Sequence, residues 1–347
     1  MTVFSHPDFS NHEGVYFASD PLSQLRVIIA VHSTTRGPSA GGTRFWRYES
    51  EAEAITDALR LSKAMSYKNA VADLPLGGGK AVVIHPDGEF DRVALFEAYG
   101  RAINHLGGRY ITAEDVGVSP KDMDVIASQT SFVAGLSKGD AASGDPSPLT
   151  ADGVFRGLIA ASEFLWGGEN LQGRSVAVQG LGHVGYALCE KLYKAGAKLI
   201  VADINQDAVK KAQDKLEAII VPVESIHAQE VDIFSPCALG GIINTRSIVD
   251  IKAKIIGGAA NNQLLRDDCI ADLDKRGILY LPDFVLNAGG IINIAAEVSG
   301  EYNPDWVEEK LSTLKETILN ILKTSKRKNI STLKVAMKIA EDRLKPT

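Results

Sequence analysis

The sequence predicts an α/β protein of two domains. Its 347 residues, 45% of them hydrophobic, are ample for a core and suggest more than one domain. Strand-like and helix-like segments alternate through the second half, as expected for a parallel sheet with helices on both faces. The stretch 134–150 is rich in Gly, Ser, Asp and Pro and has no periodic apolar pattern, so we predict a hinge there, with a cleft between the two domains.

The first part of the chain mixes strands and helices. β-branched and apolar residues predict a strand over 24–33. Ser50 and Glu53 form a capping-box pattern that starts a helix, which is expected to end before Lys68. The remaining elements are a strand at 81–85 just after three glycines, a helix at 92–108 ended by two glycines, and a strand at 109–117 running into acidic residues.

Beyond the hinge, SVAVQ (175–179) and KLIVAD (198–203) are predicted strands on either side of a helix. The tail from Asp305 has the pattern of amphipathic helices, and the terminal helix is expected to pack back on the first domain. We therefore predict a first domain of 1–135 completed by a helix at 328–347, and a second domain of 136–327.

Charge and cysteine content exclude several classes of protein. A net charge of −6 without a long Lys/Arg block argues against nucleic acid and anionic membranes as partners. No apolar run is long enough to span a bilayer, and the N-terminus lacks the features of a signal peptide. The three cysteines are scattered without a Cys-x-x-Cys pair, so we expect no metal site and a cytoplasmic location.

The strongest motif is Gly180-Leu-Gly182-His-Val-Gly185, a complete G-x-G-x-x-G between a predicted strand and a predicted helix. Gly180 allows the tight turn, Gly182 lets a pyrophosphate approach the backbone, and Gly185 lets helix and strand pack closely. The next strand ends in Asp203, whose carboxylate is placed to accept hydrogen bonds from an adenosine ribose. Because that carboxylate repels a 2′-phosphate, the motif favours NAD over NADP.

A second glycine run, LPLGGGKAVV (74–83), is not a phosphate loop, because Leu74 and Ala81 stand where that motif needs Gly and Ser or Thr. The glycines and the apolar residues around Lys80 favour a partly buried ammonium suited to acid/base chemistry. Asp115, at the end of another predicted strand, is a candidate second proton carrier. For Lys68 taken alone, a solvated surface lysine is the preferred interpretation.

Taken together, these segments resemble the amino acid dehydrogenase family of glutamate, leucine, phenylalanine and valine dehydrogenases. The resemblance covers nearly the whole chain and is nearest to the leucine branch, with the phenylalanine branch next. The family blocks occur in order as GGTRFW (41–46), YKNAVADLPLGGGKAVV (67–83), RYITAEDVG (109–117), DPSPLTADGV (145–154), VQGLGHVGYALC (178–189), SPCALGG (235–241), GGAANNQL (257–264) and DFVLNAGGIIN (283–293).

This resemblance implies roles for individual residues. Lys68, helped by the backbone at Gly42, is expected to bind the substrate α-carboxylate. Lys80 is expected to activate the water that attacks the imine carbon, and Asp115 to exchange a proton with the amino nitrogen. Contacts with the cofactor NAD or the neighbouring substrate are expected from Thr150, Gly180, Gly182, His183, Val184, Gly185, Asp203, Ile204, Cys237, Ala238, Asn261, Asn262 and Asn287.

The resemblance also implies the reaction: L-amino acid, NAD⁺ and water give a 2-oxo acid, ammonia and NADH, and the reverse. The substrate side chain is expected near Ala40, Ala113, Ile291 and Ile294, which are all apolar and therefore argue against glutamate. We predict a preference for branched-chain amino acids, with aromatic ones as the alternative, since a small Ala40 widens the pocket and Gly79 is interpreted as a feature of the phenylalanine branch. The family resemblance further implies a homo-oligomer built through the first domain.

Two other functional classes remain open on the sequence. A Schiff-base lyase with Lys80 as nucleophile would leave the dinucleotide motif without a role. A catalytically silent NAD-binding protein would leave Lys68, Lys80 and Asp115 without one. The dehydrogenase hypothesis accounts for all of these features and is preferred.

Overall fold

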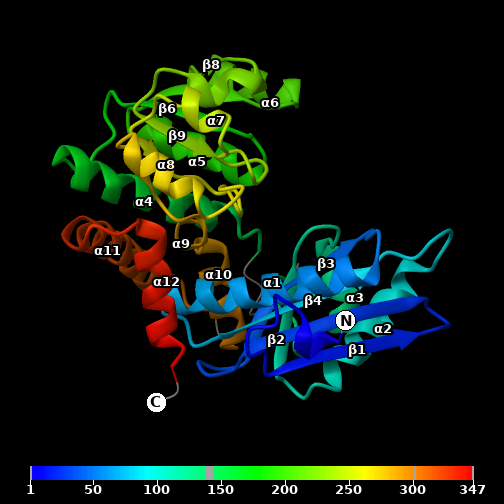
Figure 1. Cartoon of the computed structure of the whole chain (residues 1–347). Coiled ribbons are helices and arrows are strands. Elements are labelled where there is room, and N and C mark those ends of the chain that lie inside the picture. The colour runs from blue at the N-terminus through cyan, green and yellow to red at the C-terminus, as the bar shows by residue number, and fades with distance from the viewer. Residues whose placement is uncertain (1, 137–143, 301, 346–347) are drawn as a thin grey trace. The chain divides into compact units, whose positions relative to one another are not determined.

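The computed structural model describes residues 2–136, 144–300 and 302–345. These residues divide into two compact units (Figure 1). The first unit comprises Met1–Asp145, Asn293–Pro304 and Ile339–Thr347, and the second comprises Pro146–Ile292 and Asp305–Lys338. This division differs from the predicted boundaries, because 293–304 joins the first unit and 328–338 the second. The division does not bear on the predicted roles of the two domains. Substrate binding and assembly by the first and NAD binding by the second stay predictions.

The first unit contains a mixed five-stranded sheet. Strands β1 and β2 are antiparallel, β2 and β4 are antiparallel, and β4, β3 and β5 are parallel. In spatial order the strands are β1 (Gly14–Asp20), β2 (Leu25–Ser33), β4 (Gly77–Ile84), β3 (Ser39–Trp46) and β5 (Tyr110–Glu114). The strand predicted over 24–33 and the one ending near Glu114 are confirmed.

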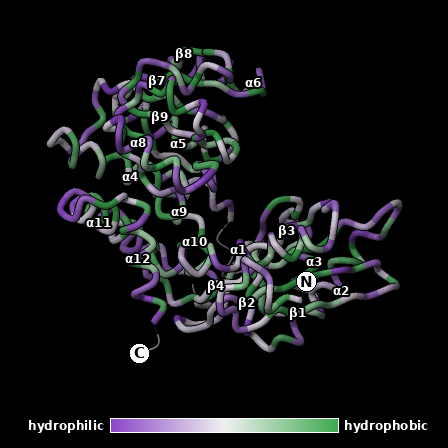
Figure 2. The backbone as a smooth tube through the Cα atoms, viewed as in Figure 1, coloured by the Kyte–Doolittle hydropathy of each residue, from purple (hydrophilic) through white to green (hydrophobic). Residues whose placement is uncertain are grey.

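Helices cover both faces of this sheet. Helix α1 (Glu51–Val71) packs on the face formed by alternate residues such as Ile28 and Val82. Helices α2 (Arg92–Asn104) and α3 (Pro120–Ala127) pack on the opposite face, which presents residues such as Ile29 and Val83. Each strand in the middle of the sheet is therefore buried on both sides, and Figure 2 shows apolar residues along these strands.

The predicted start of α1 is confirmed, but its end is not. The Ser50 hydroxyl accepts the N–H of Glu53 at 3.3 Å, and the Glu53 carboxylate accepts the N–H of Glu49 at 3.0 Å. The helix continues to Val71, so Lys68 lies inside its last turn instead of following it. A lysine there interacts favourably with the carboxyl end of the helix dipole.

The three glycines before Lys80 belong to strand β4 and do not precede it. A Cβ at Gly77 would lie 2.0 Å from the carbonyl oxygen of Ser33, and one at Gly78 would lie 2.0 Å from the backbone nitrogen of Ser66 in α1. A Cβ at Gly79 would lie 2.7 Å from the ring of Tyr110. The glycines therefore let the sheet and α1 approach closely, and the space they leave is filled by the protein itself.

The second unit has a six-stranded parallel sheet of the doubly wound dinucleotide-binding type. Its spatial order is β8 (Ile219–Ile220), β7 (Lys198–Ala202), β6 (Ser175–Gln179), β9 (Ile233–Pro236), β10 (Ile255–Ile256) and β11 (Leu279–Tyr280). The order runs outward in both directions from β6 and β9, which places a switch point of the topology between those two strands. This confirms the α/β fold class and the parallel sheet predicted from the alternation of elements.

Helices and short 3₁₀ segments complete the chain. They are η1 (Val3–Ser5), α4 (Ser147–Trp166), α5 (His183–Lys194), α6 (Gln206–Leu216), η2 (Val223–Ala228), α7 (Ser247–Asp250), α8 (Cys269–Lys275), α9 (Asp283–Leu286), α10 (Gly289–Val298), α11 (Pro304–Lys328) and α12 (Thr332–Arg343). Of the predicted hinge, 137–143 lie outside the described residues, and Ser147–Thr150 form the first turn of α4 instead of a loop. Among the described helices, none is both long and apolar enough to cross a membrane.

The last part of α12 packs on the first unit, whereas the predicted return to that unit covered the whole of 328–347. The Arg343 guanidinium donates to the carbonyl oxygens of Ala70 and Val71, each at 2.9 Å, at the end of α1. Tyr67 donates to Glu341 at 3.3 Å. The helical tail predicted from Asp305 is confirmed as α11 and α12.

Candidate active site and dinucleotide-binding loop

The Lys80 ammonium donates a short hydrogen bond to the Asp115 carboxylate. Lys80 stands in the middle of β4 with 7% of its side chain exposed, which confirms the predicted burial. Asp115 directly follows β5. The backbone at and just after Asp115 is held by two hydrogen bonds: Val118 donates to the Asp115 carbonyl at 3.0 Å, and Phe45 donates to that of Val116 at 2.9 Å. The structure thus unites the two predicted proton carriers.

Predicted substrate residues lie on the same sheet face as Lys80. Ala40 pairs with Gly78 in β4, and Gly42 pairs with Ala113 in β5, so the side-chain positions of Ala40, Gly42, Lys80 and Ala113 point toward the α1 side. A Cβ at Gly42 would lie 2.7 Å from the Cβ of Asp115. Glycine at this position therefore lets the Asp115 loop close onto β3.

Lys68 lies in the last turn of α1, the helix that covers this face of the sheet. The helix touches β4 where Ser66 packs against Gly78. The Lys68 side chain is half-buried, which argues against the solvated surface lysine that the residue taken alone suggested. Ile294 is buried in the first unit, with its Cδ1 3.8 Å from the position of a Cβ on Gly135.

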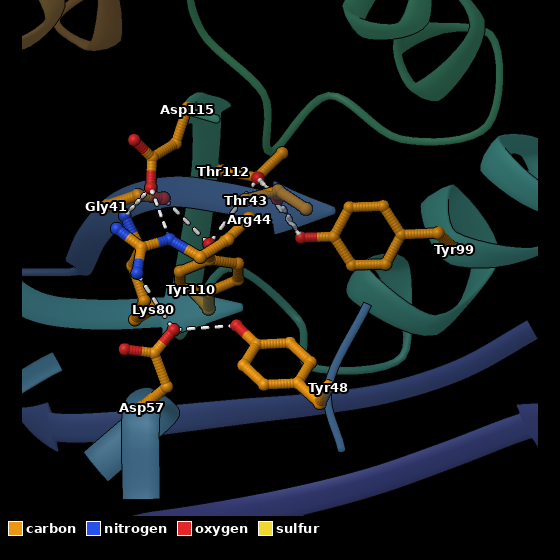
Figure 3. A network of polar contacts seen from close by, with 10 residues as sticks. All are labelled: Gly41, Thr43, Arg44, Tyr48, Asp57, Lys80, Tyr99, Tyr110, Thr112 and Asp115. Atoms are coloured by element: carbon orange, nitrogen blue, oxygen red, sulfur yellow. Dashed lines mark hydrogen bonds and ion pairs between the residues drawn. The ribbon is translucent and has the colours of Figure 1, made fainter. Parts of the chain in front are cut away.

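Three further polar residues that the sequence reasoning did not identify form a network that reaches Asp115 through Arg44 (Figure 3). The Nε of Arg44 lies 3.6 Å from Oδ2 of Asp115. Nη1 of Arg44 and the hydroxyl of Tyr48 both donate to Oδ2 of Asp57, at 2.9 and 2.6 Å. The sequence did contain a signal for Arg44. This residue follows Gly42 by two positions and therefore lies on the same face of the strand.

Burial raises the pKa of the Asp115 carboxyl, but the charge and hydrogen bond of Lys80, with the charge of Arg44, outweigh it and lower the pKa overall. Burial works against the charge of the Arg44 guanidinium, yet Asp115 and Asp57 raise its pKa above the usual value. Burial and the bond to Asp57 raise the pKa of Tyr48. At neutral pH Asp115 is therefore a carboxylate beside two cations, the state that a proton acceptor needs.

The opposite face of the same strands holds a buried hydroxyl cluster (Figure 3). Thr43 contacts the hydroxyls of Tyr99 and Thr112, each at 2.5 Å, and Tyr110 donates to the carbonyl oxygen of Gly41 at 2.7 Å. Burial raises the pKa of Tyr110 to about 12, so the phenol stays protonated and keeps donating. These bonds fix β3 against β5 directly behind Gly42 and Ala113.

The second unit forms the predicted dinucleotide loop between β6 and α5. Gly180 has φ of +94°, and a Cβ there would lie 2.7 Å from the Cβ of Ala238. A Cβ at Gly185 would lie 2.0 Å from the carbonyl oxygen of Gly180. Gly182 caps α5, and its Cβ would meet no described atom within 4 Å, which leaves the approach to the helix N-terminus open. The loop therefore fits a bound pyrophosphate.

Asp203 lies beside this loop at the end of β7. Its carboxylate accepts the N–H of Leu181 at 2.5 Å and that of Asn205 at 2.7 Å. The next residue, Ile204, is 87% exposed, as is suitable for an apolar contact with a flat base. His183 and Val184 form the first turn of α5.

Other predicted cofactor residues follow the neighbouring strands. Cys237, whose backbone donates to Gln179 at 2.7 Å, and Ala238 come directly after β9. Asn287 donates to Oδ1 of Asn261 at 2.7 Å, while its own buried Oδ1 has no hydrogen-bond donor within the described chain. The orphaned amide oxygen fits a ligand that supplies a donor.

Three predicted residues lie elsewhere in the second unit. Asn262 adopts φ of +53°, and Ile291 is buried in α10. The Thr150 hydroxyl donates to the carbonyl of Pro146 at 3.1 Å in the first turn of α4 and would lie 2.7 Å from a Cβ on Gly290. The predicted site residues are thus divided between the two units.

Comparison with known proteins shows the family of this chain. The family model for the Glu/Leu/Phe/Val dehydrogenase dimerisation domain matches residues 13–132, and that for Glutamate/Leucine/Phenylalanine/Valine dehydrogenase matches residues 199–346. The chain is 47% identical over 344 residues to the leucine dehydrogenase of Bacillus cereus, which covers 99% of this chain and 94% of that enzyme. It is 43% identical over 346 residues to the valine dehydrogenase of Streptomyces coelicolor, with coverage of 99% and 94%.

A solved structure shows the same fold at similar length. The crystal structure of L-tryptophan dehydrogenase from Nostoc punctiforme matches with a TM-score of 0.84 and 40% identity, over 96% of each chain. The Lys80–Asp115 pair and the dinucleotide loop thus occur in a chain that matches this group in sequence and in fold. The protein belongs to the Glu/Leu/Phe/Val dehydrogenase family and is an amino acid dehydrogenase, an oxidoreductase.

Proposed function

We propose that this enzyme catalyses the NAD-dependent oxidative deamination of branched-chain L-amino acids to 2-oxo acids and ammonia, and the reverse reductive amination. The observation that carries the proposal is the buried Lys80–Asp115 pair on a sheet face that also carries Ala40, Gly42 and Ala113. The names of the leucine and valine dehydrogenases to which the chain is similar support the substrate class.

In this proposal the residues of the first unit manage charge and protons. The Lys68 ammonium neutralises the α-carboxylate, and the backbone near Gly42 helps to orient it. A bound nicotinamide dinucleotide supplies the acceptor for the hydride that leaves the substrate Cα. Lys80 takes a proton from the water that attacks the resulting iminium carbon and returns it as the carbinolamine collapses. Asp115 accepts and returns the proton of the amino nitrogen.

The substrate and cofactor preferences rest on side-chain chemistry. Ala40, Ala113, Ile291 and Ile294 are all apolar and buried, and none can hold a second carboxylate, which disfavours glutamate. The Asp203 carboxylate at the end of β7 disfavours the 2′-phosphate of NADP.

A substrate screen tests the proposal. Steady-state kcat/KM would be measured with NAD and NADP for leucine, valine, isoleucine, phenylalanine and tryptophan. We expect the branched-chain substrates with NAD to give the highest values. A clear advantage for an aromatic substrate would support the alternative of an aromatic amino acid dehydrogenase, which the small Ala40 and the similarity to L-tryptophan dehydrogenase favour. Equal or better turnover with NADP would remove the role assigned to Asp203.

Replacement of Lys80 tests the mechanism. Lys80→Ala is expected to abolish turnover while NAD binding, measured by calorimetry, stays close to that of the wild type. Borohydride trapping with a 2-oxo acid should give no adduct at Lys80, and an adduct would favour a Schiff-base lyase. Tight NAD binding without turnover of any amino acid by the wild type would favour a silent binding protein.

We also propose that the enzyme is a cytoplasmic homo-oligomer assembled through its first unit. The description of the family model that matches residues 13–132 as a dimerisation domain supports the assembly. Light scattering of the purified protein would test it, and a monomer at working concentration would contradict it. Fractionation of cells would test the location.

A further inference from the structure

Arg44 approaches the Lys80–Asp115 pair from strand β3. Its Nε lies 3.6 Å from Oδ2 of Asp115, the same oxygen that receives the hydrogen bond of Lys80 (Figure 3). That separation is an ion-pair contact but is too long for a hydrogen bond. Two cations therefore face Oδ2 of Asp115, and of these two it is Lys80 that forms a hydrogen bond with this oxygen.

The Arg44 Nε is buried and has no hydrogen-bond acceptor within the described part of the chain. A buried donor without an acceptor is costly, by about 1–3 kcal/mol, and such groups are uncommon in folded proteins. A small movement of Asp115 away from Lys80 would bring its carboxylate within bonding distance of this donor. The geometry therefore provides a second partner for Asp115 that is already in place.

The rest of the guanidinium is held by residues outside the pair. Nη1 donates to Asp57 of α1 at 2.9 Å, and Tyr48 donates to the same Asp57 oxygen at 2.6 Å. Arg44, Tyr48 and Asp57 also line a hollow of about 430 Å³, together with Glu53 and Arg60. The core of the network thus contains two cations, Lys80 and Arg44, and two carboxylates, Asp115 and Asp57.

The two cations differ in one chemical respect. A lysine that acts as a base must lose its proton for part of the cycle, whereas an arginine stays charged throughout. When Lys80 is neutral, Arg44 is the remaining cation that contacts Asp115 in this network. A fixed positive charge at that moment keeps the Asp115 carboxylate ionised and in place.

We propose that Arg44 is a positioning residue for the reaction: it holds Asp115 as an oriented carboxylate while Lys80 changes its charge, and Asp57 and Tyr48 hold Arg44. The inference rests on the proposed function, which gives Lys80 its change of charge. The lowered pKa of Asp115 and the raised pKa of Arg44 agree with this arrangement.

A matched pair of variants of opposite charge tests the proposal. Arg44→Gln removes a positive charge next to Asp115, and Asp57→Asn removes a negative charge from the other side of Arg44. We expect the acidic limb of the kcat/KM profile to move to higher pH in Arg44→Gln, by about one to two pH units. In Asp57→Asn the acidic limb should move to lower pH, by at most about one unit, because the positive charge of Arg44 is then no longer neutralised by Asp57.

Two conservative variants separate charge from structure. Arg44→Lys keeps the charge but loses the two-pronged geometry, so we expect a lower kcat with the limb within about half a pH unit of the wild type. Tyr48→Phe keeps all four charges and should likewise leave the limb in place. A purely structural role for Arg44 predicts instead that all variants lose stability and activity without opposite movements of the limb.

A readout without turnover keeps this inference separate from the proposed function. In the substrate-free protein, ¹³C NMR of the aspartate carboxyls follows the titration of Asp115, with its signal identified by its loss in Asp115→Asn. Movement in opposite directions in Arg44→Gln and Asp57→Asn supports the proposal. Movement of the Asp115 titration in the same direction in both variants, or no movement, overturns the proposal. If the wild type oxidises no amino acid, the proposed function is refuted, and so is the proposal that Arg44 acts while Lys80 changes its charge. The NMR result would still decide whether Arg44 influences the titration of Asp115. Thermal unfolding of each variant identifies any that fail to fold.

Discussion

Gly79 gives a direct test of whether the glycine run serves packing or substrate choice. Neighbouring residues of β4 alternate between faces, so Gly79 points to the α2 side of the sheet, away from Lys80. A Cβ on Gly79 would lie 2.7 Å from Cδ2 of Tyr110 and 2.8 Å from Oγ of Ser39. Gly79→Ala therefore places a methyl group into a filled part of the core and not on the face that carries Lys80.

The size of the effect follows from those contacts. Carbon atoms prefer separations of about 3.5–4.0 Å, so the Tyr110 ring must retreat by roughly 0.8 Å. Tyr110 is fully buried, and its hydroxyl bond to the carbonyl of Gly41, at 2.7 Å, would weaken. Overpacking of a core costs about 1–3 kcal/mol, and a weakened hydrogen bond adds about 1 kcal/mol. We expect the free energy of unfolding of the first unit to fall by about 2–4 kcal/mol.

Chemical denaturation can isolate the first unit. The chain has three tryptophans, and Trp46 is the one in that unit. In a background with Trp166→Phe and Trp306→Phe, its fluorescence reports the unfolding of that unit alone. Gly168→Ala lies in the second unit, where the nearest foreign atom, on Asn170, would lie 3.7 Å from the new Cβ, so it should leave this signal unchanged and controls for the specificity of the readout. The ratio of kcat/KM for leucine to that for phenylalanine should stay within about twofold of the wild type, which is less than one methylene contributes.

Two results would refute this reasoning. A loss of less than about 0.5 kcal/mol in Gly79→Ala would show that the core accommodates the methyl group without overpacking. A change in the leucine-to-phenylalanine ratio of more than about tenfold, worth about 1.4 kcal/mol, would show that Gly79 selects the substrate, as its interpretation as a feature of the phenylalanine branch implied.

The remaining predictions concern pH, the dinucleotide loop and a partly buried ion-pair cluster. Burial lowers the pKa of His32 from 6.5 to about 4 in the folded protein. Between these two pH values the unfolded chain therefore binds more protons than the folded protein does. The free energy of unfolding should be highest above pH 6.5 and fall by about 3 kcal/mol as the pH drops to 4. Denaturation curves against pH should show a shallower fall for His32→Asn, and an equal slope would contradict the assignment. Gly180→Ala, at φ of +94° and against Ala238, should weaken NAD binding at least tenfold by calorimetry, and unchanged affinity would exclude close backbone contact. Asp152→Ala removes the carboxylate that pairs with Lys191 and leaves Arg156 paired with Glu308 alone, so it should cost about 1–3 kcal/mol by denaturation. Lys191→Met should cost less because Asp152 keeps Arg156.

Several elements were predictable because their signals are local. The strand at 25–33 follows from its β-branched residues, α1 from its cap at Ser50, and the tail helices from their apolar period. The loop from Gly180 to Gly185 was predictable because each glycine has a steric reason that acts within one strand, turn and helix.

Other elements were missed because non-local pairing decides them. Strand β3 contains two glycines and an arginine, a composition with low strand propensity, and it forms because β4 and β5 pair with both of its edges. Strand β4 includes Gly77–Gly79, which the predicted strand at 81–85 left out. The first turn of α4 was assigned to a hinge because its Pro and Ser residues also suit helix starts.

The sequence by itself determined the family, the α/β class and the chemical identity of the predicted proton carriers, because glycine turns, periodic apolar faces and ionisable side chains are properties of short segments. Tertiary structure decided that Lys80 and Asp115 form a hydrogen bond and that Arg44 lies beside this pair. It also decided that Ser33, Ser66 and Tyr110 pack closely against the three glycines. Those facts depend on the parallel pairing of β3 with β4 and β5, which joins segments far apart in the chain and fixes which side chains share a face.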